Sequence, residues 1–94
     1  MAAATVVSTE YGYRCHTGTE TATVTANRTA VRAFIYTPVG SNKTLTITNG
    51  KDAAVTTIWG ATAHAPVTLQ FFGKYLDGIK IQSNGDFSLM VLVA

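Results

Sequence analysis

Cys15 and His16 are the first residues to consider for chemistry, because a thiol beside an imidazole is the pair that nucleophilic catalysis uses. Neighbouring residues of a strand point to opposite faces, so these two side chains cannot hydrogen-bond as nucleophile and base. His64 would have to reach Cys15 through the fold, and the sequence does not indicate that it does. We therefore expect Cys15 to be a buried or edge thiol, and we expect no enzyme activity.

The other groups that bind metals or transfer protons are few. One cysteine and two histidines do not suffice for a closed zinc site, although a site shared on a symmetry axis, with one histidine from each subunit, stays open. The acidic residues fall mostly in expected turns or at strand ends, which favours structural roles over a glycosidase pair. These residues are Glu10, Glu20, Asp52, Asp77 and Asp86. We expect no catalytic residues, no metal and no cofactor.

Four aromatic residues form the next candidate set: Trp59, Tyr36, Phe72 and Tyr75. Such side chains can make a platform for sugars or a surface on which bases stack. Basic residues do not interleave with them as nucleic-acid binding requires. We expect them mainly in the core and in protein contacts, with a carbohydrate-binding module as an alternative function.

The charge balance also argues for a protein partner. Seven Lys or Arg residues stand against five Asp or Glu residues, and the net charge of +2 is too weak to predict nucleic-acid binding. Charged residues make up 13% of the chain, about half the usual share. A free monomer usually carries more charge for solubility, so we expect much of the surface to touch other proteins. A chain of 94 residues also gains stability by oligomerising.

No targeting or membrane segment is expected. The first residues lack the basic and apolar regions of a signal peptide. No apolar run reaches the ~18 residues that a membrane helix needs. A single cysteine allows no internal disulfide.

Threonine spacing predicts the elements that must position these residues. Threonines recur at alternate positions in residues 17–25 and 44–48. Threonine is stiff at χ1 and fits extended backbone, and period-two spacing places each run on one face of a strand. Residues 29–37 also favour a strand, although i, i+4 apolar pairs leave a helix open.

Turn residues divide the chain into strands. We expect turns at Asn27, at Asn49-Gly50, across residues 73–78 and at Asn84-Gly85. We read residues 1–10 as an arm or edge strand and residues 11–94 as a single domain. The result is an all-β chain of seven to eight short strands, an antiparallel β-sandwich that is jelly-roll-like, or a small barrel.

The last expected strand, residues 87–93, is apolar on both faces. A half-solvated strand would alternate instead. We therefore expect this strand to be central and covered on both sides, within the fold or at a subunit contact.

The C-terminal two-thirds, residues 31–94, carries a resemblance. Leu45-Thr-Ile47 is followed by Asn49-Gly50, then by Thr57-Ile58-Trp59, and then by residues 71–81, a hairpin and an apolar final strand. This order resembles small virion proteins of tailed bacteriophages, of the capsid cement or decoration class. The resemblance implies a β-sandwich that is made in the host cytoplasm and sits on the outer surface of the capsid. It also implies binding to the major capsid protein, commonly as a homotrimer at three-fold positions.

On this reading we expect contacts from Phe71, Phe72, Tyr75 and Trp59 and from an N-terminal arm that includes Ala2, Val6 and Val7. Val91 and Val93 would serve the core or the trimer seam. We expect no nucleic-acid and no membrane partner. Another virion part, such as a head–tail connector, a tail subunit or a fibre-base subunit, is an alternative.

Overall fold

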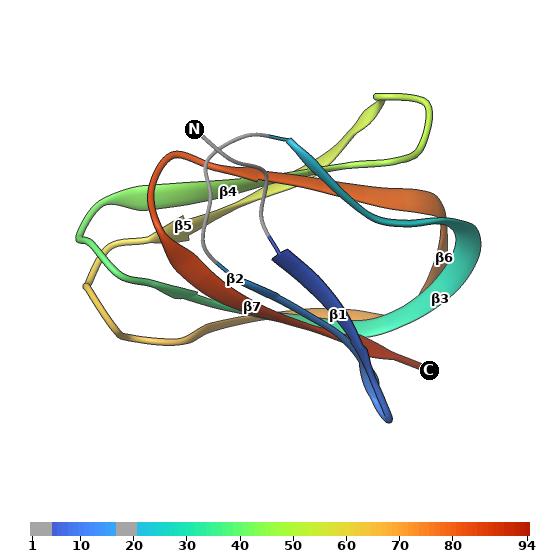
Figure 1. Cartoon of the computed structure of the whole chain (residues 1–94), viewed down its shortest axis with the longest axis horizontal. Coiled ribbons are helices and arrows are strands. Elements are labelled where there is room, and N and C mark those ends of the chain that lie inside the picture. Colours follow the sequence, from blue (N-terminus) through green and yellow to red (C-terminus); the bar gives the residue numbers. More distant parts are fainter. Residues whose placement is uncertain (1–4, 17–20) are drawn as a thin grey trace.

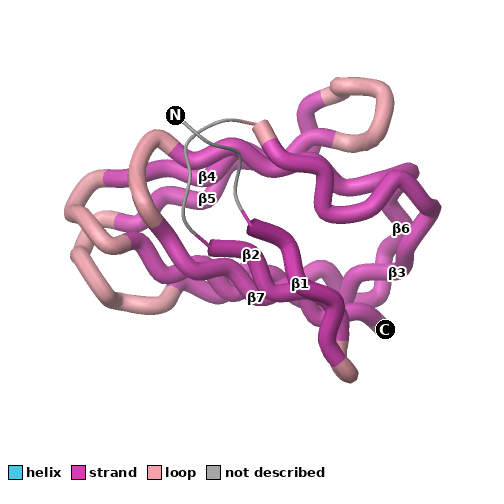
Figure 2. The backbone as a smooth tube through the Cα atoms, in the orientation of Figure 1, coloured by secondary structure: helices cyan, strands magenta, loops and turns pink. Residues whose placement is uncertain are grey.

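The computed structural model describes residues 5–16 and 21–94, and within these residues it contains seven strands and no helix. The strands are β1 (Thr5–Thr9), β2 (Gly12–His16), β3 (Ala22–Pro38), β4 (Lys43–Thr48), β5 (Ala54–Gly60), β6 (Val67–Ser83) and β7 (Phe87–Val93). Short loops join them, and most of the backbone is strand (Figure 2).

The seven strands form one antiparallel sheet with the order β1-β2-β7-β3-β6-β4-β5. The two longest strands, β3 and β6, have 17 residues each and bend together, at the right of Figure 1. Each therefore contributes to two layers. The first layer contains β1, β2, β7, the C-terminal half of β3 and the N-terminal half of β6, and the second contains the remaining halves with β4 and β5. We call these layers the first and second sheets.

The pairing is that of a jelly roll. Strand β4 pairs with β5, β3 pairs with β6 around that hairpin, and β2 pairs with β7 outside both. Folding such nested hairpins into two sheets gives the jelly-roll arrangement, here with β1 added at one edge. The sequence-based prediction of an all-β, antiparallel domain, a jelly-roll-like sandwich or a small barrel, is confirmed.

Two of the predicted turns are wrong, at Asn27 and across residues 73–78. The chain bends at both places inside β3 and β6 without leaving the sheet. Register shifts between Thr25 and Arg28 mark the corner in β3, and Gly78 with φ of +91° lies opposite in β6. Bulges of this kind let a strand turn a corner and pass from one sheet to the other.

The threonine pattern holds in one strand and fails in another. In β4, Leu45 and Ile47 are buried while the alternating threonines are half-buried on the outer face. In β3, a register shift at Val24 puts both Val24 and Thr25 inside. The bulge reverses the alternation, so the threonines of residues 21–25 do not share one face as predicted.

The core lies between the sheets. Its largest fully buried side chains are Tyr36, Phe34, Leu45, Ile47, Ile79, Ile81, Leu89, Val31 and Val91. Strand β7 is central, between β2 and β3, as predicted. Residues 5–16 and 21–94 do not fully cover its second face, however, because Met90 is 36% exposed and Leu92 is only half-buried.

The side chain of Asn49 shapes the hairpin loop between β4 and β5. The Asn49 Oδ1 atom accepts hydrogen bonds from the backbone N–H groups of Lys51, at 2.9 Å, and Ala53, at 3.0 Å. The Gly50 N–H donates to the Asp77 carbonyl at 2.8 Å, and a Cβ on Gly50 would lie 2.7 Å from that oxygen. The loop therefore needs glycine where it meets the corner of β6.

Candidate protein-binding surface

Cys15 lies in the core, where only 1% of its surface is exposed. Burial raises the pKa of the Cys15 thiol from 9.0 to about 12, so the neutral form is favoured. Its neighbour His16 is half-buried on the other face of β2. Such a thiol is a packing group, because nucleophilic cysteines need a lowered pKa and access to solvent.

The described residues contain neither a candidate metal site nor a membrane-spanning helix. Residues 5–16 and 21–94 contain no group of three or more His, Cys, Asp or Glu side chains that could hold a metal ion. The same part of the chain contains no helix long and apolar enough to cross a membrane.

The four candidate aromatics do not form one platform. Tyr36 is fully buried, which agrees with the expected core position and leaves it unable to contribute to a sugar or base platform. Trp59 lies on β5 of the second sheet and is 62% exposed. Phe72 and Tyr75 lie on β6, where they are 84% and 62% exposed. The structure therefore separates Trp59 from the pair on β6.

Phe72 is held in solvent by a bulge. Between the pairs Val31–Lys74 and Ala33–Gln70, β3 advances two residues while β6 advances four. Phe72 takes a φ of +55° and Gly73 follows with +79°. A left-handed conformation costs a residue with a Cβ about 1–2 kcal/mol, and bulges often re-aim a side chain toward a functional site. Phe72 therefore combines a left-handed backbone conformation with an apolar ring exposed to solvent, and both are unfavourable in the isolated chain.

Tyr75 lies close to Phe72 in the chain and binds a cation. The Arg28 guanidinium carbon is 4.7 Å from the centroid of the Tyr75 ring. The Nε atom of Arg28 is also 3.8 Å from the Asp77 carboxylate, with both side chains more than two-thirds exposed. Stacking on Tyr75 therefore presents a flat, charged group at the surface, and tyrosine and arginine are enriched among binding hot spots.

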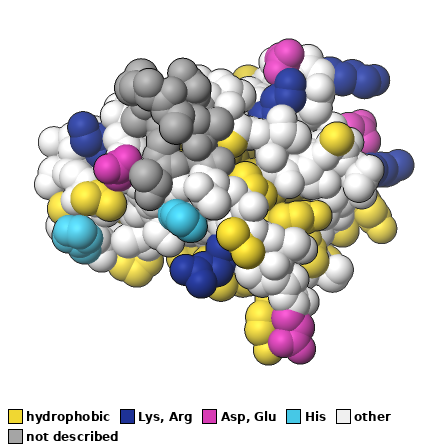
Figure 3. Space-filling model, viewed as in Figure 1, with side chains coloured by type: hydrophobic (Ala, Val, Ile, Leu, Met, Phe, Trp, Pro, Cys, Tyr) yellow, Lys and Arg dark blue, Asp and Glu magenta, His cyan; other side chains and the backbone are white. Residues whose placement is uncertain are grey.

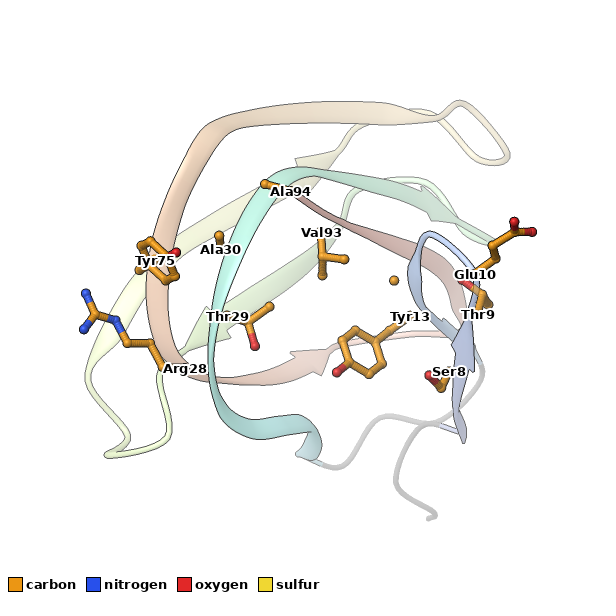
Figure 4. A pocket seen from close by; sticks show the side chains of 11 residues that line it. Ser8, Thr9, Glu10, Tyr13, Arg28, Thr29, Ala30, Tyr75, Val93 and Ala94 are labelled. Atoms are coloured by element: carbon orange, nitrogen blue, oxygen red, sulfur yellow. The ribbon is translucent and has the colours of Figure 1, made fainter.

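A hollow of about 410 Å³ lies next to this pair. In Figure 4, Tyr13 and Val93 lie in its middle, with Arg28 and Tyr75 on one side and the tip of the β1–β2 hairpin on the other. Ala94 also lines the hollow, and a Cβ on Gly73 would lie 3.8 Å from its side chain, which connects the hollow to the Phe72 bulge. We call Phe72, Tyr75, Arg28 and this hollow the corner surface.

The remaining predicted contact residues are distributed as follows. Val7 is 46% exposed on β1, while Val6 is half-buried against the core. Phe71 packs edge-to-face on Phe34 with 5.3 Å between ring centroids. Val93 is half-buried and lines the hollow. Val91 is fully buried, so its place is the core and not a contact surface, and Ala2 lies outside the described residues.

A second area, apolar except for Arg14, lies on the outer face of the first sheet. Met90 pairs with Arg14 and with Ile35, and Arg14 pairs in turn with Val7. Cross-strand partners lie on the same face, so these side chains are neighbours outside the core. In the view of Figure 3, charged side chains are scattered and do not gather into a patch of one sign.

The sequence analysis did not single out Arg28 or Met90. Arg28 is 47 residues from Tyr75, and only the pairing of β3 with β6 brings them together. Comparisons with known protein families, with curated proteins and with solved structures found no match to this chain. The function must therefore be argued from the geometry of the surface.

Proposed function

We propose that the chain is a non-enzymatic virion structural protein, a capsid cement or decoration protein that binds and stabilises a lattice of the major capsid protein. The observation that carries the proposal is Phe72, which is 84% exposed at a φ of +55°. Contact with another protein would bury this ring and return about 1.5–3 kcal/mol of transfer free energy. No interaction within the described residues offers the ring such burial, because 84% of its surface stays in solvent.

The rest of the corner surface suits a protein partner. An apolar ring, a tyrosine and an arginine stand beside a hollow, which is the composition of binding hot spots. The jelly roll is an architecture found in viral capsid proteins, which supports the proposal only as a fold analogy.

The mechanism is stabilisation by preferential binding. A ligand that binds the assembled lattice and not the free subunits stabilises the lattice by its binding free energy. A standard interface buries about 1,600 Å² in total, about half of it on each partner. Repetition over a shell makes modest individual affinities effectively permanent.

Contact with further copies of the chain belongs, on this proposal, to the outer face of the first sheet. Met90 and Val7 are exposed there beside the half-buried Ile35. Burial of this face between copies would cover the second side of β7, as a homotrimer or another homo-oligomer would require.

The test is co-sedimentation of the purified chain with empty, expanded heads of the phage that carries its gene. Binding that saturates at a fixed copy number supports the proposal, and Phe72→Gly should weaken it at least about tenfold, the effect of losing roughly 1.4 kcal/mol. Thr68→Ala, an exposed change on the same strand, is the matched control. Absence of pelleting with the heads overturns the proposal, while pelleting with tails or connectors assigns the chain to another virion part.

A further inference from the structure

We propose that the outer face of β4, β5 and the C-terminal end of β6 binds a neutral glycan, with Trp59 as the surface on which a sugar ring stacks. This inference concerns the second sheet and does not depend on the capsid proposal. We call Trp59, Thr44, Thr46, Thr57, Gln82 and Asn84 the Trp59 face.

Trp59 is exposed on an edge strand. It pairs with Thr44 of β4, and its indole is 62% exposed, while its neighbour Ile58 points into the core. No bulge separates Thr57 from Trp59, so both point outward. The strand therefore places an apolar ring on the outside of a sheet whose inner side is already packed.

Hydroxyl and amide groups surround the indole. Thr46 pairs with Thr57 on one side and with Gln82 on the other, so these three side chains form a row beside the ring. The Asn84 Oδ1 atom accepts a hydrogen bond from the Thr44 N–H at 2.9 Å, which holds that amide at the end of the sheet. Threonine hydroxyls and carboxamides both donate and accept hydrogen bonds.

Among the residues that the structure describes, none with a charged side chain lies at the centre of the Trp59 face. Lys80, at its far end, is bound to Asp52 with 2.8 Å between Nζ and Oδ1. The side chain of Lys43 packs closely against Gly40 and Gly85. A Cβ atom added to either glycine would lie 3.0 Å from the Lys43 side chain. A neutral ligand fits this arrangement, whereas a phosphate or a nucleic-acid strand would need exposed cations.

A sugar is the neutral ligand that matches these groups. One face of a pyranose ring presents C–H groups that pack on an aromatic ring, and its edge carries hydroxyls that pair with threonine and amide groups. A protein partner would need a larger apolar centre than one indole. The exposed face of the sheet suits an extended polysaccharide over a small molecule, which prefers an enclosed pocket.

The experiment is a fluorescence titration of the whole chain. Trp59 is the single tryptophan of the sequence, so its emission reports this face alone. The probes are soluble galactomannan, xyloglucan and laminarin, with heparin as an anionic counterpart. We expect a saturable change with at least one neutral polysaccharide and none with heparin. No saturable change with any of the three, or a preference for heparin, overturns the proposal.

Variants are compared by affinity electrophoresis in gels that contain the polysaccharide. Trp59→Ala should reduce retardation at least about tenfold, and Gln82→Ala should reduce it by a smaller factor. Tyr75→Ala, on the corner surface, is the matched control and should bind as the parent chain does. Equal binding by Trp59→Ala overturns the proposal. Because Trp59→Ala should still bind heads and Phe72→Gly should still bind polysaccharide, failure of one proposal is distinguishable from failure of the other.

Discussion

The hydroxyl of Tyr36 lies 3.4 Å from the hydroxyl of Ser83 and joins the two sheets across the core. Tyr36 belongs to the half of β3 in the first sheet, and Ser83 ends β6 in the second. The Ser83 hydroxyl itself donates to the Gly85 carbonyl at 2.8 Å, so the Tyr36 hydroxyl is the donor in the bond between them. A buried polar chain of this kind ties the sandwich to the β6–β7 loop.

The first prediction follows from this bond. Tyr36→Phe removes the donor and should lower the free energy of unfolding by about 0.5–1.5 kcal/mol, the usual net value of a buried hydrogen bond. Urea unfolding followed by far-UV circular dichroism measures the change. Tyr75→Phe, whose ring is 62% exposed, is the control and should leave the free energy within about 0.5 kcal/mol. Equal effects of the two variants would contradict the assignment.

The second prediction concerns the two faces of β7. Leu89 is fully buried and its neighbour Met90 is 36% exposed. Leu89→Ala should cost about 2–5 kcal/mol because it leaves a cavity in the core. Met90→Ala should cost about 1 kcal/mol or less in the isolated chain. Similar losses for both variants, measured by urea unfolding of dilute protein, would show that Met90 is covered even without a partner.

Local patterns in the sequence specify much of this fold. Alternation identified β4, where Leu45 and Ile47 point inward, and the Asn-Gly pairs marked the loops after β4 and β6. The apolar final strand required neighbours on both sides, and β2 and β3 provide them. These features depend on residues close together in the chain, which is why the sequence reveals them.

The corners were missed because they depend on pairing between distant segments. Gly73 and Gly78 look like turn residues, yet with Phe72 they form bulges in a strand that stays paired with β3. A bulge and a turn use the same residue types, so local sequence does not separate them. The corner surface was predicted only in part: Phe72 and Tyr75 were expected contacts, but Arg28 was not, since it meets Tyr75 only through that pairing.

The third prediction tests the strained backbone at Phe72. Glycine adopts a φ of +55° without the left-handed cost of about 1–2 kcal/mol but loses about 0.5–1 kcal/mol through backbone entropy. Phe72→Gly should therefore leave the folded chain as stable as before, or up to about 1 kcal/mol more stable. Thermal or urea unfolding measures this difference.

Phe71→Gly is the matched control for the third prediction. Phe71 is not one of the residues with a positive φ, and its ring packs edge-to-face on Phe34. Its loss should cost about 3 kcal/mol or more, because both packing and backbone order are removed. If Phe72→Gly destabilised the chain as much as Phe71→Gly, the exposed ring would have a structural role and the argument for a contact residue would fail.

The fourth prediction concerns Cys15 and pH. Burial raises the pKa of its thiol from 9.0 to about 12, so at pH 8 the folded chain holds about a thousandfold less thiolate than the unfolded chain. Alkylation by iodoacetamide should therefore be at least about a hundredfold slower in buffer than in urea.

The raised pKa also means that the contribution of this group to stability is complete below pH 9 and is lost as pH rises toward 12. Cys15→Ala lacks that contribution, so its stability should fall less than that of the parent chain over this interval. Alkylation of the folded parent chain at the rate seen in urea would show that β2 opens readily, and would contradict the packed position of this strand against Leu89.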